Sequence, residues 1–291
     1  MKKAFLQLHV AIFLAGFTGV LGRLITLNEA LLVWYRMMFA AVTLFIIYYF
    51  SKKKEHLNIK EISNLFGIGG IIALHWVFFY GSIKYANVSV SLICFSAIGF
   101  FSAVLDPIIS KRKFIALELL LGLLVMLGIS LMFHFDPQFR TGIIFGMISS
   151  LLAAIFPVLN KKMMQKHDPG TITFFEMTGG FSILTLILPI YLQFVPTQKL
   201  IPGIADLGWL LILSLLCTVL AFNLSVRSLS KISPFTVNLS FNLEPVYGIA
   251  LAFLIYKEYQ EVGVSFYIGI AIIFLTVVVQ SLRVYLQAKP K

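Results

Sequence analysis

Ten apolar stretches, each about as long as a membrane-crossing helix, constrain this chain more than any other feature of its sequence. An α-helix needs about 20 mostly apolar residues to cross the hydrocarbon core of a bilayer. The stretches lie at residues 4–22, 30–50, 62–84, 87–110, 114–133, 141–160, 171–192, 206–228, 233–256 and 264–286. The sequence therefore predicts an all-α integral membrane protein with ten transmembrane helices. The boundary between the third and fourth stretches is the shortest, because only Tyr85 and Ala86 separate them.

The composition excludes an ordinary soluble protein. Of the 291 residues, 59% are hydrophobic and 12% are charged, and the mean hydropathy is +0.96. Soluble domains are closer to half apolar and about a quarter charged. A membrane β-barrel would show short alternating strands, whereas the apolar residues here form continuous runs. We therefore expect lipid to be the solvent for most of this surface.

Basic residues are concentrated in alternate gaps between the apolar stretches. Of the 23 Lys and Arg residues, 17 lie at the two termini and in the even-numbered gaps, 5 lie in the odd-numbered gaps, and Arg36 lies within a stretch. Cytoplasmic loops of membrane proteins carry such an excess. The pattern predicts that both termini are cytoplasmic, in a multi-pass protein of the cell (inner) membrane. The net charge of +11 is then expected to face anionic lipid and not nucleic acid.

The first apolar stretch resembles a signal peptide, and the two cysteines raise the question of a disulfide. The first stretch has a basic start and an apolar core, like a signal peptide, but a clear cleavage site is missing. We interpret it as an uncleaved first helix. Both cysteines, Cys94 and Cys217, lie deep in apolar stretches, so they are expected to pack as small apolar residues without forming a disulfide.

The chain repeats itself weakly. Residues 79–112 align with residues 225–258 at an offset of 146 positions, with identical residues at several places, including Lys111 and Lys257. The sequence predicts a first five-helix repeat at residues 1–136 and a second at 137–291, which together form one transport domain. Because five is odd, the second repeat would enter the membrane from the opposite side. Inverted repeats of this kind are common in transporters that bind substrate near the midplane.

Two segments resemble a known family. The segments NVSVSLICFSAIGFFSAVLDPIISKRKF and SPFTVNLSFNLEPVYGIALAFLIYKE are similar to the fourth and ninth helices of the drug/metabolite transporter superfamily, in its EamA branch. In that family the ninth helix often carries Leu-Glu-Pro and a later Glu, here Leu243, Glu244, Pro245 and Glu258. The first copy departs from the pattern with Gly99 in place of the proline and Lys-Arg-Lys in place of the final Gly-Glu. The resemblance implies ten helices and export or exchange of a small metabolite.

Ionisable residues within the stretches are the main candidates for function, because they are costly in a bilayer and usually face a cavity or a partner. Glu244 and His75 are expected near the midplane. Glu244 either fastens helices around a helix break at Pro245, or binds a proton or a cationic substrate. It has no basic partner on its own helix, so we take His75 as the first candidate partner. His75 itself is either a packed, hydrogen-bonded residue or a proton relay.

Other polar residues in the stretches have two interpretations each. Arg36 either reaches the outer interface or binds a substrate carboxylate in a cavity, and Glu176, at the equivalent repeat position, either reaches the inner interface or faces the cavity. Opposite depths are expected to keep these two residues from pairing. Asp106 is expected to pair with nearby basic residues. Two further pairs at helical spacing either pack or line a cavity: Asn238 with Asn242, and Trp76 with Tyr80.

Motifs of catalysis are missing from the sequence. It contains no glycine-rich phosphate loop, no Cys/His cluster with metal-ligand spacing and no GxSxG. We therefore expect no cofactor, no metal and no enzyme activity. Transport of an amino acid or similar solute, driven by an ion or substrate gradient, is the leading hypothesis. A flippase for a lipid or lipid-linked sugar is the alternative, and an integral membrane enzyme is the third. A homodimer also remains possible, since glycines recur in the fifth and tenth stretches.

Overall fold

The computed structural model describes residues 2–51, 55–135 and 137–288, and it describes their side chains except at 132–135, 234, 235, 239, 242, 277 and 280–288. Within these ranges all regular elements are helices. Seven helical segments of the described chain are long and apolar enough to cross a membrane, namely Lys2–Leu24, Glu29–Phe50, Ile59–Tyr85, Val88–Ser110, Pro137–Met163, Pro169–Phe194 and Ile204–Ser228. Shorter apolar helices cover Ala116–Leu131, Glu244–Tyr256 and Val264–Thr276. The all-helical membrane fold is thus confirmed, while the number of ten spans stays a prediction.

The helices fall at the predicted apolar stretches. The first half contains α1 (Lys2–Leu24), α2 (Glu29–Phe50), α3 (Ile59–Tyr85), α4 (Val88–Phe95), α5 (Ile98–Ser110) and α6 (Ala116–Phe135). The second half contains η1 (Pro137–Phe139), α7 (Arg140–Met163), α8 (Pro169–Phe194), α9 (Ile204–Ser214), the π-helix η2 (Leu215–Leu220), α10 (Ala221–Ser228), α11 (Pro234–Ser240), η3 (Phe241–Leu243), α12 (Glu244–Tyr256), η4 (Glu258–Gln260) and α13 (Val264–Ala288).

Short polar side chains begin four of these helices. The side-chain oxygens of Asn28, Asn58, Asn87 and Asp168 accept hydrogen bonds from backbone N–H groups in the first turns of α2, α3, α4 and α8. On α3 the cap is reciprocal, because the Glu61 carboxylate accepts a bond from the Asn58 N–H. These caps satisfy donors that have no partner inside the helix. They explain how α3 ends and α4 begins within two residues, at the boundary that the sequence predicted.

Two of the predicted spans are interrupted at equivalent positions. The backbone turns at Ser96 and Ala97 between α4 and α5, and it tightens into the 3₁₀ helix η3 just before α12. At an offset of 146 positions, Phe95 corresponds to Phe241, so the breaks coincide in the two halves. Pro245 stands in the first turn of α12, where a missing N–H costs little. The first half breaks at the same place without a proline, which shows that Pro245 is not required for such a break.

The ends of these interrupted spans also match. Lys111 ends α5 with φ 53° and ψ 40°, and Lys257 ends α12 with φ 56° and ψ 32°. These are the two non-glycine residues with positive φ in the described chain. L-residues seldom adopt this left-handed conformation, because the Cβ approaches the carbonyl oxygen. Its occurrence at two positions 146 residues apart supports the internal repeat.

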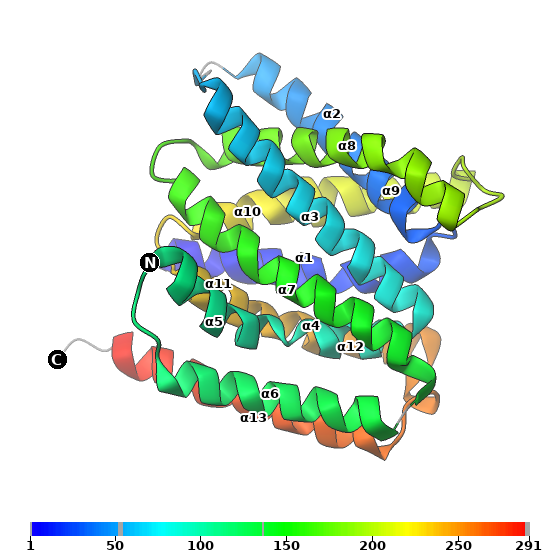
Figure 1. Ribbon diagram of the computed structural model, residues 1–291, viewed down its shortest axis with the longest axis vertical. Helices are drawn as coiled ribbons and strands as arrows, with labels where there is room; N and C mark the ends of the chain where they lie inside the picture. The colour runs from blue at the N-terminus through cyan, green and yellow to red at the C-terminus, as the bar shows by residue number, and fades with distance from the viewer. Residues whose placement is uncertain (1, 52–54, 136, 289–291) are drawn as a thin grey trace.

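Helices from the two halves interleave (Figure 1). Helix α3 of the first half packs on α7 and α8 of the second half. In the corresponding contacts of the second half, α10 packs on α1 and α9 packs on α2. Likewise α5 packs on α7, and α12 packs on α1. Each contact thus has a counterpart in which the halves exchange roles. Along one edge of the molecule α6 and α13 lie side by side, and α2 and α8 lie near the opposite edge (Figure 1).

Glycines permit the closest helix contacts. A Cβ on Gly69 of α3 would lie 2.0 Å from the carbonyl oxygen of Glu176 on α8, so only glycine fits there. A Cβ on Gly128 of α6 would lie 3.0 Å from the carbonyl oxygen of Gly269 on α13. The glycines of α6 and α13 therefore serve packing within the chain at this point. The homodimer stays a prediction, and the contact between Gly128 and Gly269 gives it no support because it lies within one chain.

Candidate functional site

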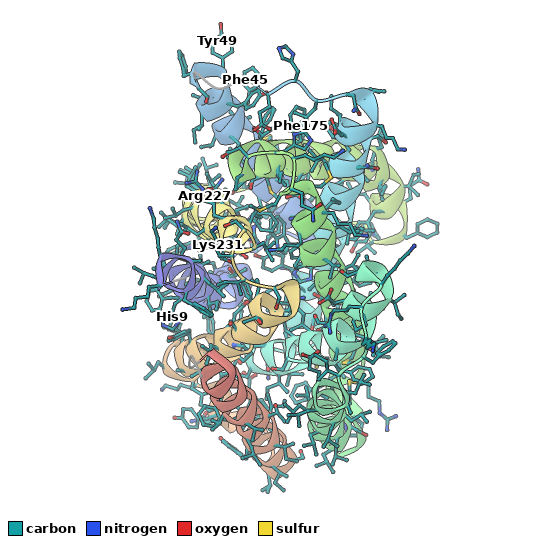
Figure 2. All side chains as sticks on the ribbon, turned by 90° about the vertical axis from the view of Figure 1, so that its left-hand side faces the viewer. His9, Phe45, Tyr49, Phe175, Arg227 and Lys231 are labelled. Atoms are coloured by element: carbon teal, nitrogen blue, oxygen red, sulfur yellow. The ribbon has the colours of Figure 1, made fainter. Side chains whose placement is uncertain are left out.

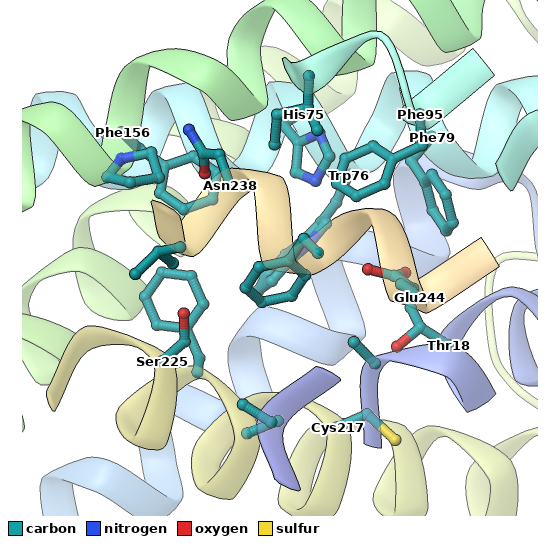
Figure 3. A pocket seen from close by; sticks show the side chains of 18 of the residues that line it. Thr18, His75, Trp76, Phe79, Phe95, Phe156, Cys217, Ser225, Asn238 and Glu244 are labelled. Atoms are coloured by element: carbon teal, nitrogen blue, oxygen red, sulfur yellow. The ribbon is translucent and has the colours of Figure 1, made fainter. Parts of the chain in front are cut away.

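A cavity lies between the halves, and helices α1, α2, α3, α7, α10, α11 and α12 contribute to its wall (Figure 3). The cavity has a volume of about 80 Å³ that is open to the centres of water molecules. Its lining residues are Ala11, Ala15, Thr18, Arg36, His75, Trp76, Phe79, Phe95, Ile98, Phe156, Pro157, Cys217, Ala221, Phe222, Ser225, Val237, Asn238, Phe241 and Glu244. Most of these side chains are apolar or aromatic, with a few polar groups among them, as in typical small-molecule sites.

Glu244 is the one carboxylate among the lining residues. It begins α12 directly after η3, so the interrupted helix sets where its side chain leaves the backbone. Its side chain is 5% exposed and points toward the cavity (Figure 3). Among the described residues no hydrogen bond or ion pair reaches its carboxyl oxygens. A buried acid without a hydrogen-bonded partner is costly. The positive charge of Arg36 in the same cavity compensates the acid in part, and water, a proton or a solute can supply the rest.

Arg36 is the one basic residue that lines the cavity, apart from the imidazole of His75. It is 2% exposed, and its guanidinium donates three hydrogen bonds: Nε to the Thr218 hydroxyl at 2.7 Å, one terminal nitrogen to the Tyr80 hydroxyl at 2.8 Å, and the other to the Cys217 carbonyl at 3.2 Å. Its guanidinium carbon lies 3.6 Å from the centroid of the Trp76 ring. These contacts hold the planar cation in one orientation.

The partners of Arg36 come from an irregular helix. Cys217 and Thr218 belong to the π-helix η2, in which the Thr218 hydroxyl bonds to the carbonyl of Leu213. A π-segment widens the helix and often occurs at functional sites. Here it brings both a backbone carbonyl and a hydroxyl to one arginine. Neither group carries a negative charge, so Arg36 has no ion pair within 4 Å among the described residues.

His75 is held by α7 and not by Glu244. Its Nδ1 lies 2.9 Å from the carbonyl oxygen of Ser149 and 2.8 Å from the Ser149 hydroxyl. The same hydroxyl donates to the His75 carbonyl at 3.1 Å, which joins α3 and α7 at this point. The partnership expected between His75 and Glu244 is therefore corrected, since the imidazole bonds across α3 and α7. The ring still lines the cavity, beside Phe79, Phe95 and Phe156 (Figure 3).

The other predicted site residues divide between cavity and core. Trp76 lines the cavity, whereas Tyr80 lies behind it and is fully buried while bonding to Arg36. Asn238 lines the cavity and donates to the Ser102 hydroxyl at 2.7 Å, so it also links α11 with α5. The side chain of Asn242 lies outside the described residues.

Glu176 does not line the cavity. It is fully buried on α8, and neither carboxyl oxygen has a hydrogen-bond partner among the described residues. Asn160 on α7 is the polar residue beside it, also fully buried and without a hydrogen bond of good geometry. As expected, Arg36 and Glu176 form no ion pair. A carboxyl and an amide of this kind can satisfy each other when the acid carries a proton.

Polar contacts join the two halves at the end of the molecule away from the termini. The Glu258 carboxylate accepts from the N–H groups of Val88 and Ser89 at 3.1 and 2.8 Å, and it forms an ion pair with Arg23. Nearby, Asp206 accepts from the Thr26 N–H at 2.9 Å and pairs with a lysine, and Tyr191 bonds to Glu29. Sequence reasoning had noted Glu258 only as part of a family pattern.

Two smaller expectations are confirmed. Asp106 forms an ion pair with Arg112 at 3.1 Å. Cys94 and Cys217 are free and buried. No group of three or more His, Cys, Asp or Glu residues that could hold a metal ion is found among the described residues.

Apolar helices surround a cavity whose wall holds an acid and a base without an ion-pair partner among the described residues, an arrangement that suits a membrane transport protein. Comparison with known proteins gives the family. The model described as the EamA-like transporter family matches residues 2–134 and 140–282, and the chain belongs to this family. The resemblance inferred from the two quoted segments is thereby confirmed, because EamA is part of the drug/metabolite transporter superfamily.

Individual relatives agree with this assignment. An uncharacterized transporter of Haemophilus influenzae is 27% identical over 163 residues, which is 53% of each chain. An uncharacterized transporter of Archaeoglobus fulgidus is 39% identical over 69 residues, or 24% of each chain. The alignments thus span about half and about a quarter of these relatives. A protein of solved crystal structure has a TM-score of 0.67 at 13% identity, over 99% of this chain and 100% of that one, which shows a shared fold. Family and relatives indicate a transporter rather than an enzyme.

Proposed function

We propose that this protein is a secondary transporter that moves an amino acid or a similar small solute by alternating access around the central cavity. The observation that carries the proposal is the pair of opposite charges in the cavity wall. Glu244 and Arg36 both line the cavity, and neither has an ion-pair partner within 4 Å among the described residues. A zwitterionic solute offers an ammonium for the carboxylate and a carboxylate for the guanidinium. The aromatic walls from Trp76 and Phe79 supply apolar contact for a side chain.

The internal repeat supports alternating access between two inverted halves of five spans each. The interrupted spans, the left-handed lysines and the exchanged helix contacts all recur at equivalent places in residues 1–136 and 137–291. Inverted repeats allow a protein to adopt inward-open and outward-open states by exchanging the conformations of its halves. The breaks at η3 and between α4 and α5 lie beside the cavity, where a hinge needs a few residues that change backbone angles.

The contacts support a state that is closed at the outer end. The links made by Glu258, Asp206 and Tyr191 join the two halves there. Several lining residues, such as Phe156, Ser225 and Asn238, lie toward the end of the molecule that carries the N- and C-termini of the chain. With the cytoplasmic termini predicted from the charge pattern, the cavity then faces the cytoplasm. Export would begin by binding solute in this state.

The flippase alternative needs a lateral path from the cavity to the bilayer. A second, exposed groove between α2, α8 and α10 shares no lining residue with the central cavity. This separation favours a soluble solute over a lipid as the transported molecule. A lipid substrate would be favoured again if reconstituted protein moved labelled lipid between leaflets.

The test is transport by purified protein in liposomes, screened over amino acids and related organic solutes, with and without a pH gradient. We expect one or more solutes to cross faster than in protein-free liposomes, and Glu244→Gln and Arg36→Lys to reduce that flux. Lys231→Gln is the matched control, because Lys231 is an exposed basic residue that does not line the cavity. Flux equal to protein-free liposomes for all solutes, or equal flux in all variants, would overturn the proposal.

A further inference from the structure

A groove lined by apolar, acidic and basic residues lies between α2, α8 and α10, at the end of the molecule that carries the termini (Figure 1). The groove has a volume of about 430 Å³ that is open to the centres of water molecules. It is lined by Leu44, Ile47, Tyr48, Ser51, Glu55, Asp168, Gly170, Thr171, Val219, Leu220, Asn223 and Arg227. Figure 2 views this end of the molecule, with Arg227 of α10 below the end of α2 that carries Phe45 and Tyr49.

The apolar part of the groove is exposed. Ile47 on α2 is 56% exposed and Leu220 at the end of η2 is 45% exposed, and Leu44 and Val219 continue the same wall. Exposed aliphatic side chains on a membrane helix are expected to contact acyl chains. This part of the groove therefore suits a hydrocarbon chain.

The basic side of the groove is formed by Arg227 on α10. Its Nε donates to the Asn223 side-chain oxygen at 2.6 Å, one turn earlier on the same helix. No other hydrogen bond or ion pair of this guanidinium is found among the described residues. The bond at Nε orients the guanidinium, and its terminal N–H groups can bind a phosphate, whose geometry they match.

The acidic side of the groove faces it from Asp168 and Glu55. One Glu55 oxygen accepts from the Asp168 N–H at 2.9 Å, and the other lies 3.3 Å from His167 Nδ1. One Asp168 oxygen accepts from the Gly170 N–H at 2.8 Å. A carboxylate offers about four acceptor sites, so both acids retain acceptors for another cation. Among the described residues, the rim thus carries one cationic and two anionic groups.

From this arrangement we infer that the groove is a binding site for a zwitterionic phospholipid with a primary ammonium headgroup, of the phosphatidylethanolamine class. The phosphate binds Arg227, the ammonium donates to Asp168 and Glu55, and one acyl chain lies along Ile47 and Leu220. A phosphatidylcholine headgroup has no N–H to donate to the carboxylates. An anionic headgroup without an ammonium is repelled by them. The placement of the headgroup in the cytoplasmic leaflet rests on the cytoplasmic termini of the proposed function.

Bound lipid would contact the segment that holds the cavity arginine. In η2, Val219 and Leu220 line the groove, whereas the adjacent Cys217 and Thr218 bond to Arg36. A π-helix is less regular than an α-helix and depends on its neighbours for its shape. Lipid packed on one side of η2 is therefore expected to stabilise the geometry on the other.

The experiment measures lipid retention by native mass spectrometry, on the full chain in detergent with defined phosphatidylethanolamine, phosphatidylcholine or phosphatidylglycerol and without substrate. We expect phosphatidylethanolamine to be retained at least about fivefold more strongly than the other two, as one extra charged hydrogen bond provides. Arg227→Gln should weaken retention of phosphatidylethanolamine about fivefold or more. Asp168→Asn, which keeps a side chain suited to the α8 cap, should remove the preference over phosphatidylcholine.

Lys231→Gln is the matched control, since it removes an exposed basic residue at the same end that does not line the groove. It should leave retention unchanged. Thermal unfolding checks each variant, and Glu55→Gln replaces Asp168→Asn if that variant does not fold. Equal retention of all three lipids by the wild type, a preference for phosphatidylglycerol, or an equal loss in Lys231→Gln would overturn the inference. Because no solute is present, failure here leaves the proposed transport function untouched.

Discussion

Glu244→Gln tests the cavity acid with little structural disturbance. Glutamine has nearly the same shape as glutamate, but it cannot ionise. The carboxyl of Glu244 has no hydrogen-bond or ion-pair partner among the described residues. The substitution therefore breaks no hydrogen bond or ion pair of the described residues, and it removes only the longer-range attraction between Glu244 and Arg36. We expect the melting temperature to stay close to that of the wild type, because the substitution keeps the side-chain volume and breaks no hydrogen bond, so it has none of the usual causes of a large loss of stability.

The expected functional effect depends on what the carboxylate binds. If it binds the ammonium of the solute, the variant loses one charged hydrogen bond, which contributes about 1–3 kcal/mol. This corresponds to a loss of affinity between about 5-fold and about 150-fold. If instead it carries the coupling proton, the affinity changes little, and the dependence of flux on the pH gradient disappears while solute exchange continues.

Two assays separate these outcomes. Solute affinity is measured in detergent by calorimetry, and flux is measured in liposomes with an imposed pH gradient. Glu244→Ala serves as a comparison, since it also removes side-chain volume and should lower the melting temperature. Wild-type affinity together with wild-type pH dependence in a well-folded Gln variant would refute both functional interpretations. Glu244 would then be a structural residue of the α12 start.

Further substitutions test the surroundings of the cavity and the topology. Arg36→Lys keeps the charge but loses the planar stacking on Trp76 and most of the three hydrogen bonds of Arg36. It should lower the free energy of unfolding by about 1–3 kcal/mol, as measured by thermal unfolding. An unchanged melting temperature would contradict the role assigned to the guanidinium. Gly128→Leu should separate α6 from α13 at Gly269 and lower stability by about 1–3 kcal/mol without changing solute affinity; a tenfold affinity loss at unchanged stability counts against it. A cysteine replacing Lys231 should react with a membrane-impermeant thiol reagent only from the cytoplasmic side, against a low background from the buried native cysteines; labelling from outside disproves the topology.

Local features of the sequence determined most of the helices. Apolar stretches of membrane-spanning length are local, so the sequence alone was enough to place most of the helices. The caps at Asn58 and Asn87, which fix where α3 and α4 begin, became known from the structure. The weak repeat at an offset of 146 positions was also visible in the sequence. The matched breaks were not, because Ser96 and Ala97 at the first break are neither glycine nor proline, and Gly99 replaces the proline of the second half.

The cavity was predicted in part. Glu244, His75, Arg36, Trp76 and Asn238 were candidates because a polar side chain within an apolar run is costly and usually faces a cavity or a partner. All five line the cavity. Polarity alone, however, does not say whether a residue faces the cavity or a partner on another helix. Glu176 was chosen by the same reasoning, but it lies between α8 and α7 and not in the cavity.

Partners were decided by the tertiary structure alone. Arg36 bonds to Thr218, which is 182 positions away, and His75 bonds to Ser149, which is 74 positions away. Nothing in a single sequence marks such pairs, since a serine or threonine in an apolar run also bonds to its own helix. The direction of each side chain depends on how the helices rotate and cross, and that is fixed by packing across the whole bundle. The sequence thus determined which polar groups enter the membrane, and only the packed fold decided which of them remained unpaired in the cavity.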